Sequence, residues 1–161
     1  MPSIRYILFK TPSQYWKEAI QLRRKVFIEE QGVPEAIELD DRDESACHLV
    51  ALHPQETCGV MRILLEDNHA KLGRIATHPN YRHQGIGTAM VNQAISFCHI
   101  AGIQTISLNS QNYITHFYEK LGFQSAGEPF QEAGIPHIHM VLNRPKGHHD
   151  ELNLAEPLNQ S

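Results

Sequence analysis

The sequence lacks the features that define several large classes of protein. Its three cysteines, Cys47, Cys58 and Cys98, are isolated and form no CxxC pair, so neither a disulfide framework nor a zinc finger is expected. Isolated thiols fit a reducing compartment. The N-terminal segment has no signal-peptide core, and no apolar run approaches the roughly 18 residues of a membrane span. We therefore expect a cytoplasmic protein without a membrane partner.

Strong charge of one sign is also absent. The chain has 14 lysines and arginines and 18 aspartates and glutamates, for a formal net charge of -4. This balance argues against nucleic acid as a partner. The 161 residues, of which 41% are hydrophobic and 20% charged, are enough for one globular domain with a core. We predict a single domain over residues 1–144 and a polar, mobile tail over residues 145–161.

Hydrophobic periodicity predicts strands that alternate with helices. A first helix is expected to begin at Thr11 and Pro12 and to run to about Gln31, a second covers residues 85–101, and a third covers residues 112–121. The predicted strands are residues 4–9, 47–52, 57–65, 70–77, 104–109, 123–127 and 138–143. Because a helix connects the strands at 70–77 and 104–109, these two should be parallel, with a ligand at their carboxyl ends.

The most informative stretch lies between the strand that ends at Thr77 and the helix that follows it. Here Arg82 precedes Gly85 and Gly87 at a predicted helix N-terminus. Free N–H groups and the helix dipole favour an anion there, and the glycines leave the backbone open to a phosphate. The stretch is not a Walker loop, because no Gly-Lys-Ser/Thr follows, and Met90 stands where a dinucleotide fingerprint has its third glycine.

The R-x-x-G-x-G string over residues 82–87, after a strand that ends I-A-T-H-P, closely resembles the acyl-CoA-binding motif of the GCN5-related N-acetyltransferase (GNAT) superfamily. Residues 27–34, 117–123 and 134–137 are similar to its ElaA/YjcF-type branch, and the resemblance covers nearly all of residues 1–144. It implies an α/β (α+β) fold of the GNAT type. Such a fold has a mixed central sheet of about six to seven strands, flanking helices and a splayed parallel pair at the centre.

The resemblance implies that acetyl-CoA is a co-substrate. A strand edge would pair with the pantetheine arm through backbone groups, and the glycine loop would hold the pyrophosphate. The residues expected to bind acetyl-CoA are Ile75, Ala76, Thr77, Arg82, His83, Gln84, Gly85, Ile86, Gly87, Thr88 and Asn112. Asn112 has an alternative role as a helix N-cap, to which its side chain is well suited.

The resemblance also implies a reaction: transfer of an acetyl group from acetyl-CoA to a primary amine by direct attack in a ternary complex. Tyr118, within the F-Y-E-K-L-G-F segment, would protonate the leaving thiolate. Taken alone, this tyrosine is more simply a helix residue bonded to a backbone carbonyl. Two other functions stay open: an acyl-CoA sensor of the same fold, and an unrelated nucleotide hydrolase, which would need a lysine and a metal-binding carboxylate.

The acceptor amine, carried by a small molecule or a peptide, must lose a proton, and the sequence leaves the base open. Glu29, Asp40 and His137 are expected on the acceptor side. The candidate bases are Glu29, Glu30, Asp40, His48, His137 and His139. His137 and His139 share a strand face, but no third ligand stands at a diagnostic spacing, so no metal site is predicted. The resemblance is compatible with a homodimer.

Residues 35–45 form the most acidic stretch of the chain. One interpretation is a solvated loop, and the other is an electrostatic funnel for a cationic amine. Arg23 and Arg24 are expected on a helix surface, and Cys98 is expected in the core because it falls on the apolar stripe of the helix at 85–101.

Overall fold

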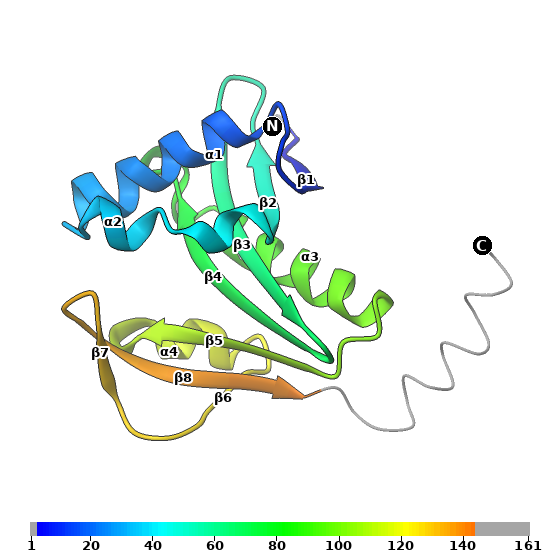
Figure 1. Ribbon diagram of the computed structural model, residues 1–161, viewed down its shortest axis with the longest axis vertical. Helices are drawn as coiled ribbons and strands as arrows, with labels where there is room; N and C mark the ends of the chain where they lie inside the picture. The colour runs from blue at the N-terminus through cyan, green and yellow to red at the C-terminus, as the bar shows by residue number, and fades with distance from the viewer. Residues whose placement is uncertain (1–2, 144–161) are drawn as a thin grey trace, which may run out of the picture.

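The structure is a computed structural model that describes residues 3–143, so the predicted tail lies outside the described residues. Within them, eight strands form one mixed sheet in the order β1-β2-β3-β4-β5-β8-β6, with β7 paired to β8 (Figure 1). The strands are β1 (Arg5–Phe9), β2 (Cys47–Leu52), β3 (Thr57–Glu66), β4 (His69–Thr77), β5 (Thr105–Gln111), β6 (Gln124–Ser125), β7 (Phe130–Glu132) and β8 (Ile135–Asn143).

The predicted mixed sheet with a parallel pair is confirmed. The pair formed by β4 and β5 is parallel, and the other paired strands are antiparallel. The sheet has eight strands instead of six to seven because β7 forms within the segment that was expected to be a loop. This short strand folds back along β8 and brings Glu132 opposite Ile135.

Helices cover both faces of the sheet. The helical segments are α1 (Trp16–Arg23), η1 (Arg24–Glu30), α2 (Glu35–Glu38), η2 (Asp41–Glu44), η3 (Pro79–Tyr81), α3 (Ile86–Ile100), η4 (Asn112–Ile114) and α4 (Thr115–Glu119). The helix predicted at 85–101 corresponds closely to α3. The first helix changes from α to π geometry at Arg24, and the third begins as a 3₁₀ turn, so both are less regular than their periodicity indicated.

The predicted start of the first helix is wrong by several residues. Thr11 does not cap it, because its hydroxyl donates to the carbonyl of Glu44 at 3.5 Å. The helix begins at Trp16, and the Tyr15 N–H just before it donates to Ser13 Oγ at 3.1 Å. The connection from β1 is therefore a turn fastened to η2, which lies much further along the chain.

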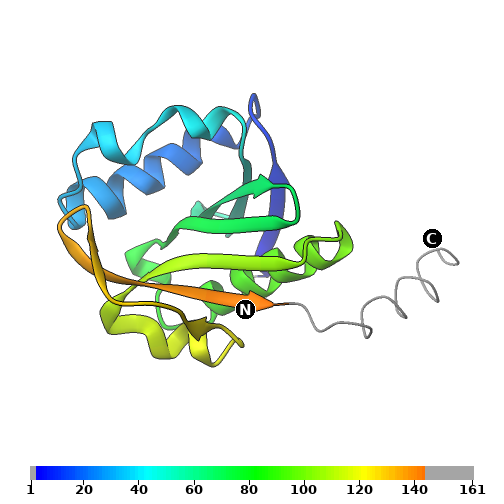
Figure 2. The same cartoon turned by 60° about the horizontal axis from the view of Figure 1, so that its bottom comes forward.

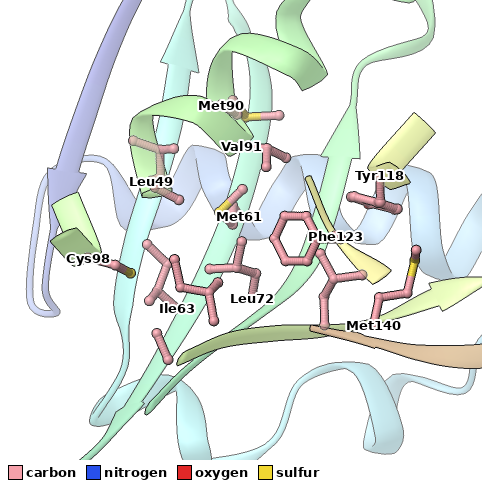
Figure 3. Close-up of a cluster of buried hydrophobic side chains, with 14 of the residues drawn as sticks. Leu49, Met61, Ile63, Leu72, Met90, Val91, Cys98, Tyr118, Phe123 and Met140 are labelled. Atoms are coloured by element: carbon pink, nitrogen blue, oxygen red, sulfur yellow. The ribbon is translucent and has the colours of Figure 1, made fainter. Parts of the chain in front are cut away.

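The larger core lies between the sheet and α3 and α4. Leu72 of β4, Leu108 of β5 and Met90 of α3 are buried there, and Cys98 is fully buried among them, as predicted (Figure 3). Tyr118 of α4 belongs to the same core. A smaller cluster on the opposite face joins α1 to Val50, Val60 and Ala76 of β2, β3 and β4, and Figure 2 shows α1 along that face.

The parallel pair separates part of the way along its length. The register of β4 with β5 runs from His69 opposite Thr105 to Leu72 opposite Leu108 and then stops. Beyond this point β4 stays with β3 as far as Thr77, while β5 stays with β8 as far as Gln111. Within the described residues, the edges of β4 and β5 that face each other are therefore unpaired at their carboxyl ends.

Candidate active site

The glycine loop places a row of free backbone donors at the carboxyl end of β4. Gly85 is the N-cap of α3 and has a φ of 83°, a left-handed conformation that glycine adopts without strain. Within residues 3–143, no backbone acceptor binds the N–H groups of residues 85–88. These are the donors that any helix leaves free in its first turn, where the dipole is positive. We call residues 85–88 the amide cradle.

The cradle lies beside the helix that carries Tyr118. A Cβ atom added at Gly87 would lie 3.4 Å from Phe117 Cζ and 3.9 Å from Thr77 Oγ1. The Phe117 and Tyr118 rings are 4.9 Å apart in an edge-to-face arrangement. The end of β4, the cradle and α4 therefore meet at one place, and a bare glycine keeps the space between them open.

Tyr118 is 6% exposed, and its ring packs against Phe117 and Phe123. Its hydroxyl makes no hydrogen bond to another described residue, so the simpler role of a helix tyrosine bonded to a carbonyl does not apply. Burial raises the pKa of this phenol to about 12, because the charged phenolate is disfavoured in an apolar site. At neutral pH Tyr118 is thus a protonated donor without a partner.

Arg82 was expected to hold phosphate, and the structure gives its side chain protein partners. Its Nε donates to the carbonyl of Thr77 at 3.0 Å, and its two terminal nitrogens donate to both oxygens of Glu30 at 2.8 Å each. The hydrogen bond from Arg82 lowers the pKa of the Glu30 carboxyl. This pair is partly exposed and joins the end of η1 to the start of the glycine loop.

The other residues expected at the coenzyme take up different positions. Ile75 packs on the α3 side of the sheet and Ala76 on the α1 side, so both present backbone to the unpaired edge of β4. His83 and Gln84 are exposed in the loop, and His83 has a φ of 64°. Asn112 is exposed, and the cap position before η4 belongs to Gln111, so the N-cap alternative for Asn112 is wrong.

The acidic stretch is solvated only in part: Glu35, Asp41 and Glu44 are exposed, whereas other carboxylates of the stretch bind arginines. Glu38 and Asp43 are 3% and 5% exposed, and both bind Arg23, which is completely buried. Arg62 and Arg74 complete the set: Arg62 pairs with Asp40 at 2.6 Å and Asp43 at 3.1 Å, and Arg74 pairs with Glu38 and Asp40 at 3.2 Å each. We call these six residues, three arginines and three carboxylates, the inner charged cluster.

The inner charged cluster changes the roles of two residues considered from the sequence. Burial alone would raise the pKa of the Asp40 carboxyl, but the hydrogen bond and charge of Arg62 and the charge of Arg74 hold that pKa below its usual range. Asp40 therefore neutralises buried arginines. Arg23, expected on a surface, lies on the same helical stripe as Ala19 and Val26, and that position was the signal that it is buried.

His48 is excluded as an accessible base. Its ring is fully buried between Phe9 and Trp16, with centroids 5.4 and 4.8 Å away, and its Nε2 lies 3.0 Å from the Asp43 carbonyl. Burial lowers its pKa, so the ring is held neutral. Glu29, by contrast, is exposed near the end of η1.

A second group of polar residues lies on β5, β7 and β8, on the face away from Tyr118. Asn109 Nδ2 donates to Glu132 Oε1 at 3.1 Å, and His139 Nδ1 lies 2.8 Å from Asn109 Oδ1. His137, expected at the acceptor site, is 7% exposed, and its Nε2 lies 4.0 Å from Glu132 Oε2. Glu132 was missed in the sequence because it approaches His137 only where β7, its own strand, turns back and pairs with β8.

The part of the chain described by the structure contains no group of three or more His, Cys, Asp or Glu residues arranged to hold a metal ion. In residues 3–143, no helix is long and apolar enough to cross a membrane.

A mixed sheet that splays between two parallel strands, with an amide cradle on the following helix, defines the GNAT fold, a class of acyltransferases. The chain belongs to the GNAT acetyltransferase family: the sequence model described as "Acetyltransferase (GNAT) domain" matches residues 12–144. GNAT acetyltransferases use an acyl-CoA donor and act on amine acceptors.

Similar proteins identify the branch of the family. The uncharacterized protein YyaT of Bacillus subtilis is 37% identical over 127 residues, which are 77% of this chain and 86% of YyaT. The uncharacterized N-acetyltransferase YjcF of the same organism is 31% identical over 126 residues, 78% of this chain and 90% of YjcF. The crystal structure of Escherichia coli ElaA superposes with a TM-score of 0.79 at 24% identity, covering 88% of this chain and all of that one (100%). The predicted ElaA/YjcF-like branch is thus confirmed.

Proposed function

We propose that this protein transfers an acetyl group from acetyl-CoA to a primary amine by direct attack within a ternary complex. The observation that carries the proposal is the meeting of three features at the carboxyl end of β4: an unpaired strand edge, the amide cradle and the protonated hydroxyl of Tyr118. The polar groups of all three features have no hydrogen-bond partner among the described residues.

The residues present fit the coenzyme. The amide cradle offers backbone donors at the positive end of α3 for a pyrophosphate, and Gly85 and Gly87 leave the approach free of side chains. The free edge of β4 at residues 75–77 offers peptide groups that can pair with the amide-rich pantetheine arm as an added strand would. Acetyl-CoA, when bound, supplies an acetyl group activated as a thioester.

The roles of the protein groups follow from the chemistry of acyl transfer. Backbone N–H groups at the splay stabilise negative charge on the carbonyl oxygen, an effect worth about 3 kcal/mol for a well-placed donor. Tyr118 donates its proton to the sulfur as the C–S bond breaks. Because burial raises the pKa of Tyr118 to about 12, the phenol is protonated at neutral pH, as a proton donor must be.

Release of free thiol from acetyl-CoA, measured against a panel of alkylamines, amino acids and peptides, tests the proposal. We expect turnover with at least one amine, formation of the N-acetyl product by mass spectrometry, and a thermal shift with CoA that ATP does not reproduce. Tight binding of CoA without turnover on any amine would overturn the proposal and favour an acyl-CoA sensor. Stabilisation by ATP as strong as that by CoA would instead point to a different phosphate ligand.

A further inference from the structure

The proposed function leaves one proton without an acceptor, because an alkylammonium must lose a proton before its nitrogen can attack. Three of the six candidate bases are paired or buried. Glu30 holds Arg82 with both oxygens, Asp40 pairs with Arg62 and Arg74, and His48 is fully buried. Glu29, His137 and His139 remain.

The hydrogen bonds around Asn109 fix the proton on His139. A carboxylate only accepts hydrogen bonds, so the Asn109 amide nitrogen must be the atom that faces Glu132, at 3.1 Å. The amide oxygen then faces His139 Nδ1 at 2.8 Å, and an amide oxygen only accepts. His139 therefore donates from Nδ1, and in its neutral form Nε2 carries the lone pair. That Nε2 has no hydrogen-bond partner among the described residues.

The position of His139 suits a base on the acceptor side. Asn109 is the first residue of β5 beyond the last pair with β4, and His139 is its register neighbour on β8. Their side chains point to the face opposite to that of Leu108, Met140 and Tyr118, because successive residues of a strand alternate. A proton donor and a proton acceptor thus lie on opposite faces of the same half of the sheet.

His137 and Glu29 are less suited. His137 donates from Nδ1 to the carbonyl of Ile135 at 2.7 Å, its ring stacks on Phe130, and it is 7% exposed. Glu29 is exposed, and no described residue orients its carboxylate. His139 is half-buried and has a fixed tautomer, which is the arrangement in which a third group orients a base.

Building on the proposed function, we propose that His139 is the general base of the transfer and that Asn109 and Glu132 are positioning residues for its imidazole. Nε2 takes one proton from the substrate ammonium, and the imidazolium passes that proton to solvent. The freed amine forms the C–N bond, and the nitrogen then loses its second proton to solvent. As the C–S bond breaks, Tyr118 gives its proton to the sulfur, and the phenolate takes a proton back from solvent. The sum is one amide, one thiol and one proton.

The tautomer of His139 tests the geometry without any turnover. Ring nitrogen spectra of protein labelled with ¹⁵N-histidine, recorded at about pH 8, distinguish Nδ1–H from Nε2–H. The His139 signal is the one missing from the spectrum of His139→Gln. We expect Nδ1–H in the wild type and a shift toward Nε2–H in Asn109→Leu, which removes the acceptor, and in Glu132→Gln, which lets the Asn109 amide turn over. A wild-type His139 that carries its proton on Nε2 would overturn the assignment.

Kinetics test the role of the base. We expect His139→Gln to lower kcat about 100-fold or more while Kd for CoA changes by less than about twofold, since general bases contribute roughly 10²–10⁴. His116→Gln, whose side chain on α4 is 78% exposed, is the control and should keep the wild-type kcat. A kcat for His139→Gln close to that of the wild type, in a protein that turns over, would refute the base and leave the proposed function intact. A wild type that acetylates no amine would refute the proposed function and the base together, while the tautomer would still report the hydrogen bonds described above.

Discussion

The protein uses its polar groups in two opposite ways on the two faces of β4. In the inner charged cluster, on the face covered by α1 and α2, all members but Asp40 and Arg74 are buried, and each arginine meets carboxylates at 2.6–3.2 Å. The amide cradle and the Tyr118 hydroxyl, at the carboxyl end of β4 and on the α4 side, have no partners among the described residues. The same strand thus separates polar groups that bind one another within the fold from polar groups at which we propose that the coenzyme binds.

The comparison indicates that polar groups without a protein partner are a better guide to a binding site than the charge of a segment. The acidic stretch suggested a funnel because of its composition, yet its buried carboxylates are neutralised by arginines from α1, β3 and β4. The cradle carries no formal charge. Two buried atoms in or beside the inner charged cluster do lack hydrogen-bond partners, His48 Nδ1 and Arg62 Nε. Because the His48 ring is neutral and its Nε2 meets a carbonyl, Nδ1 is an unpaired acceptor; nothing in the structure explains the unpaired Nε of Arg62.

The largest effect is expected from removing the buried cation of the inner charged cluster. Arg23→Met removes the fully buried cation that binds both Glu38 and Asp43, which then keep only their longer contacts with Arg74 and Arg62, and breaking a buried ion pair in this way costs about 3–5 kcal/mol. Denaturant unfolding measures this free energy. Arg24→Met is the matched control, because its pair with Glu35 is exposed and such pairs contribute at most about 1 kcal/mol. Equal losses in the two variants would contradict the assignment of a structural role to Arg23.

The next largest effect concerns the amide cradle. Gly87→Val fills the space between Thr77 and Phe117 that a phosphate would need, so we expect the affinity for CoA to fall by more than about 100-fold while the domain stays folded. Asn92→Val places the same side chain on the exposed face of α3 and should leave the affinity unchanged. Isothermal titration and circular dichroism measure binding and folding. Unchanged affinity in folded Gly87→Val would show that the coenzyme binds elsewhere.

Tyr118→Phe keeps the aromatic packing and removes only the hydroxyl that has no partner. We expect kcat to fall about 100-fold and Kd for CoA to stay within about threefold of the wild type. Because burial raises the pKa of Tyr118 to about 12, the phenol stays protonated at lower pH, and the ratio of the two kcat values should be constant from about pH 7 to pH 9. A parallel loss of kcat and coenzyme affinity would indicate a tyrosine that only supports the binding site.

The fold around the proposed coenzyme site could be predicted from the sequence because its parts are contiguous. The glycine loop, the N-terminus of α3 and the end of β4 all lie within residues 75–88, and backbone groups do not depend on which side chains meet. The parallel pair of β4 and β5 followed from the helix between them. The position of Tyr118 came from a family resemblance, because periodicity alone marks it as an ordinary helix residue.

The contacts of the inner charged cluster and of the group around Asn109 could not be predicted, because their residues meet only after folding. Arg23 binds carboxylates 15 and 20 residues away, and the Asn109 side chain bonds to Glu132 and His139, which are 23 and 30 residues away. Local patterns contain no information on such pairings beyond the face on which each residue lies. The strand β7, which carries Glu132, was itself hidden in a segment with glycine and proline.

The smallest predicted effect comes from the ion pair between Arg82 and Glu30, which joins the end of η1 to the start of the glycine loop. Both terminal nitrogens of the Arg82 guanidinium donate to Glu30. Arg82 must therefore break this contact before it can bind a phosphate, which lowers the affinity. Glu30→Gln weakens that contact, and we expect the affinity for CoA to rise about two- to fivefold, consistent with a partly exposed ion pair worth less than about 1 kcal/mol. The gain depends on the freed guanidinium of Arg82. It should therefore vanish in the double variant that combines Glu30→Gln with Arg82→Met. If Glu30→Gln weakens binding instead, Glu30 positions the Arg82 side chain for the coenzyme, and Arg82 binds the pyrophosphate together with the amide cradle.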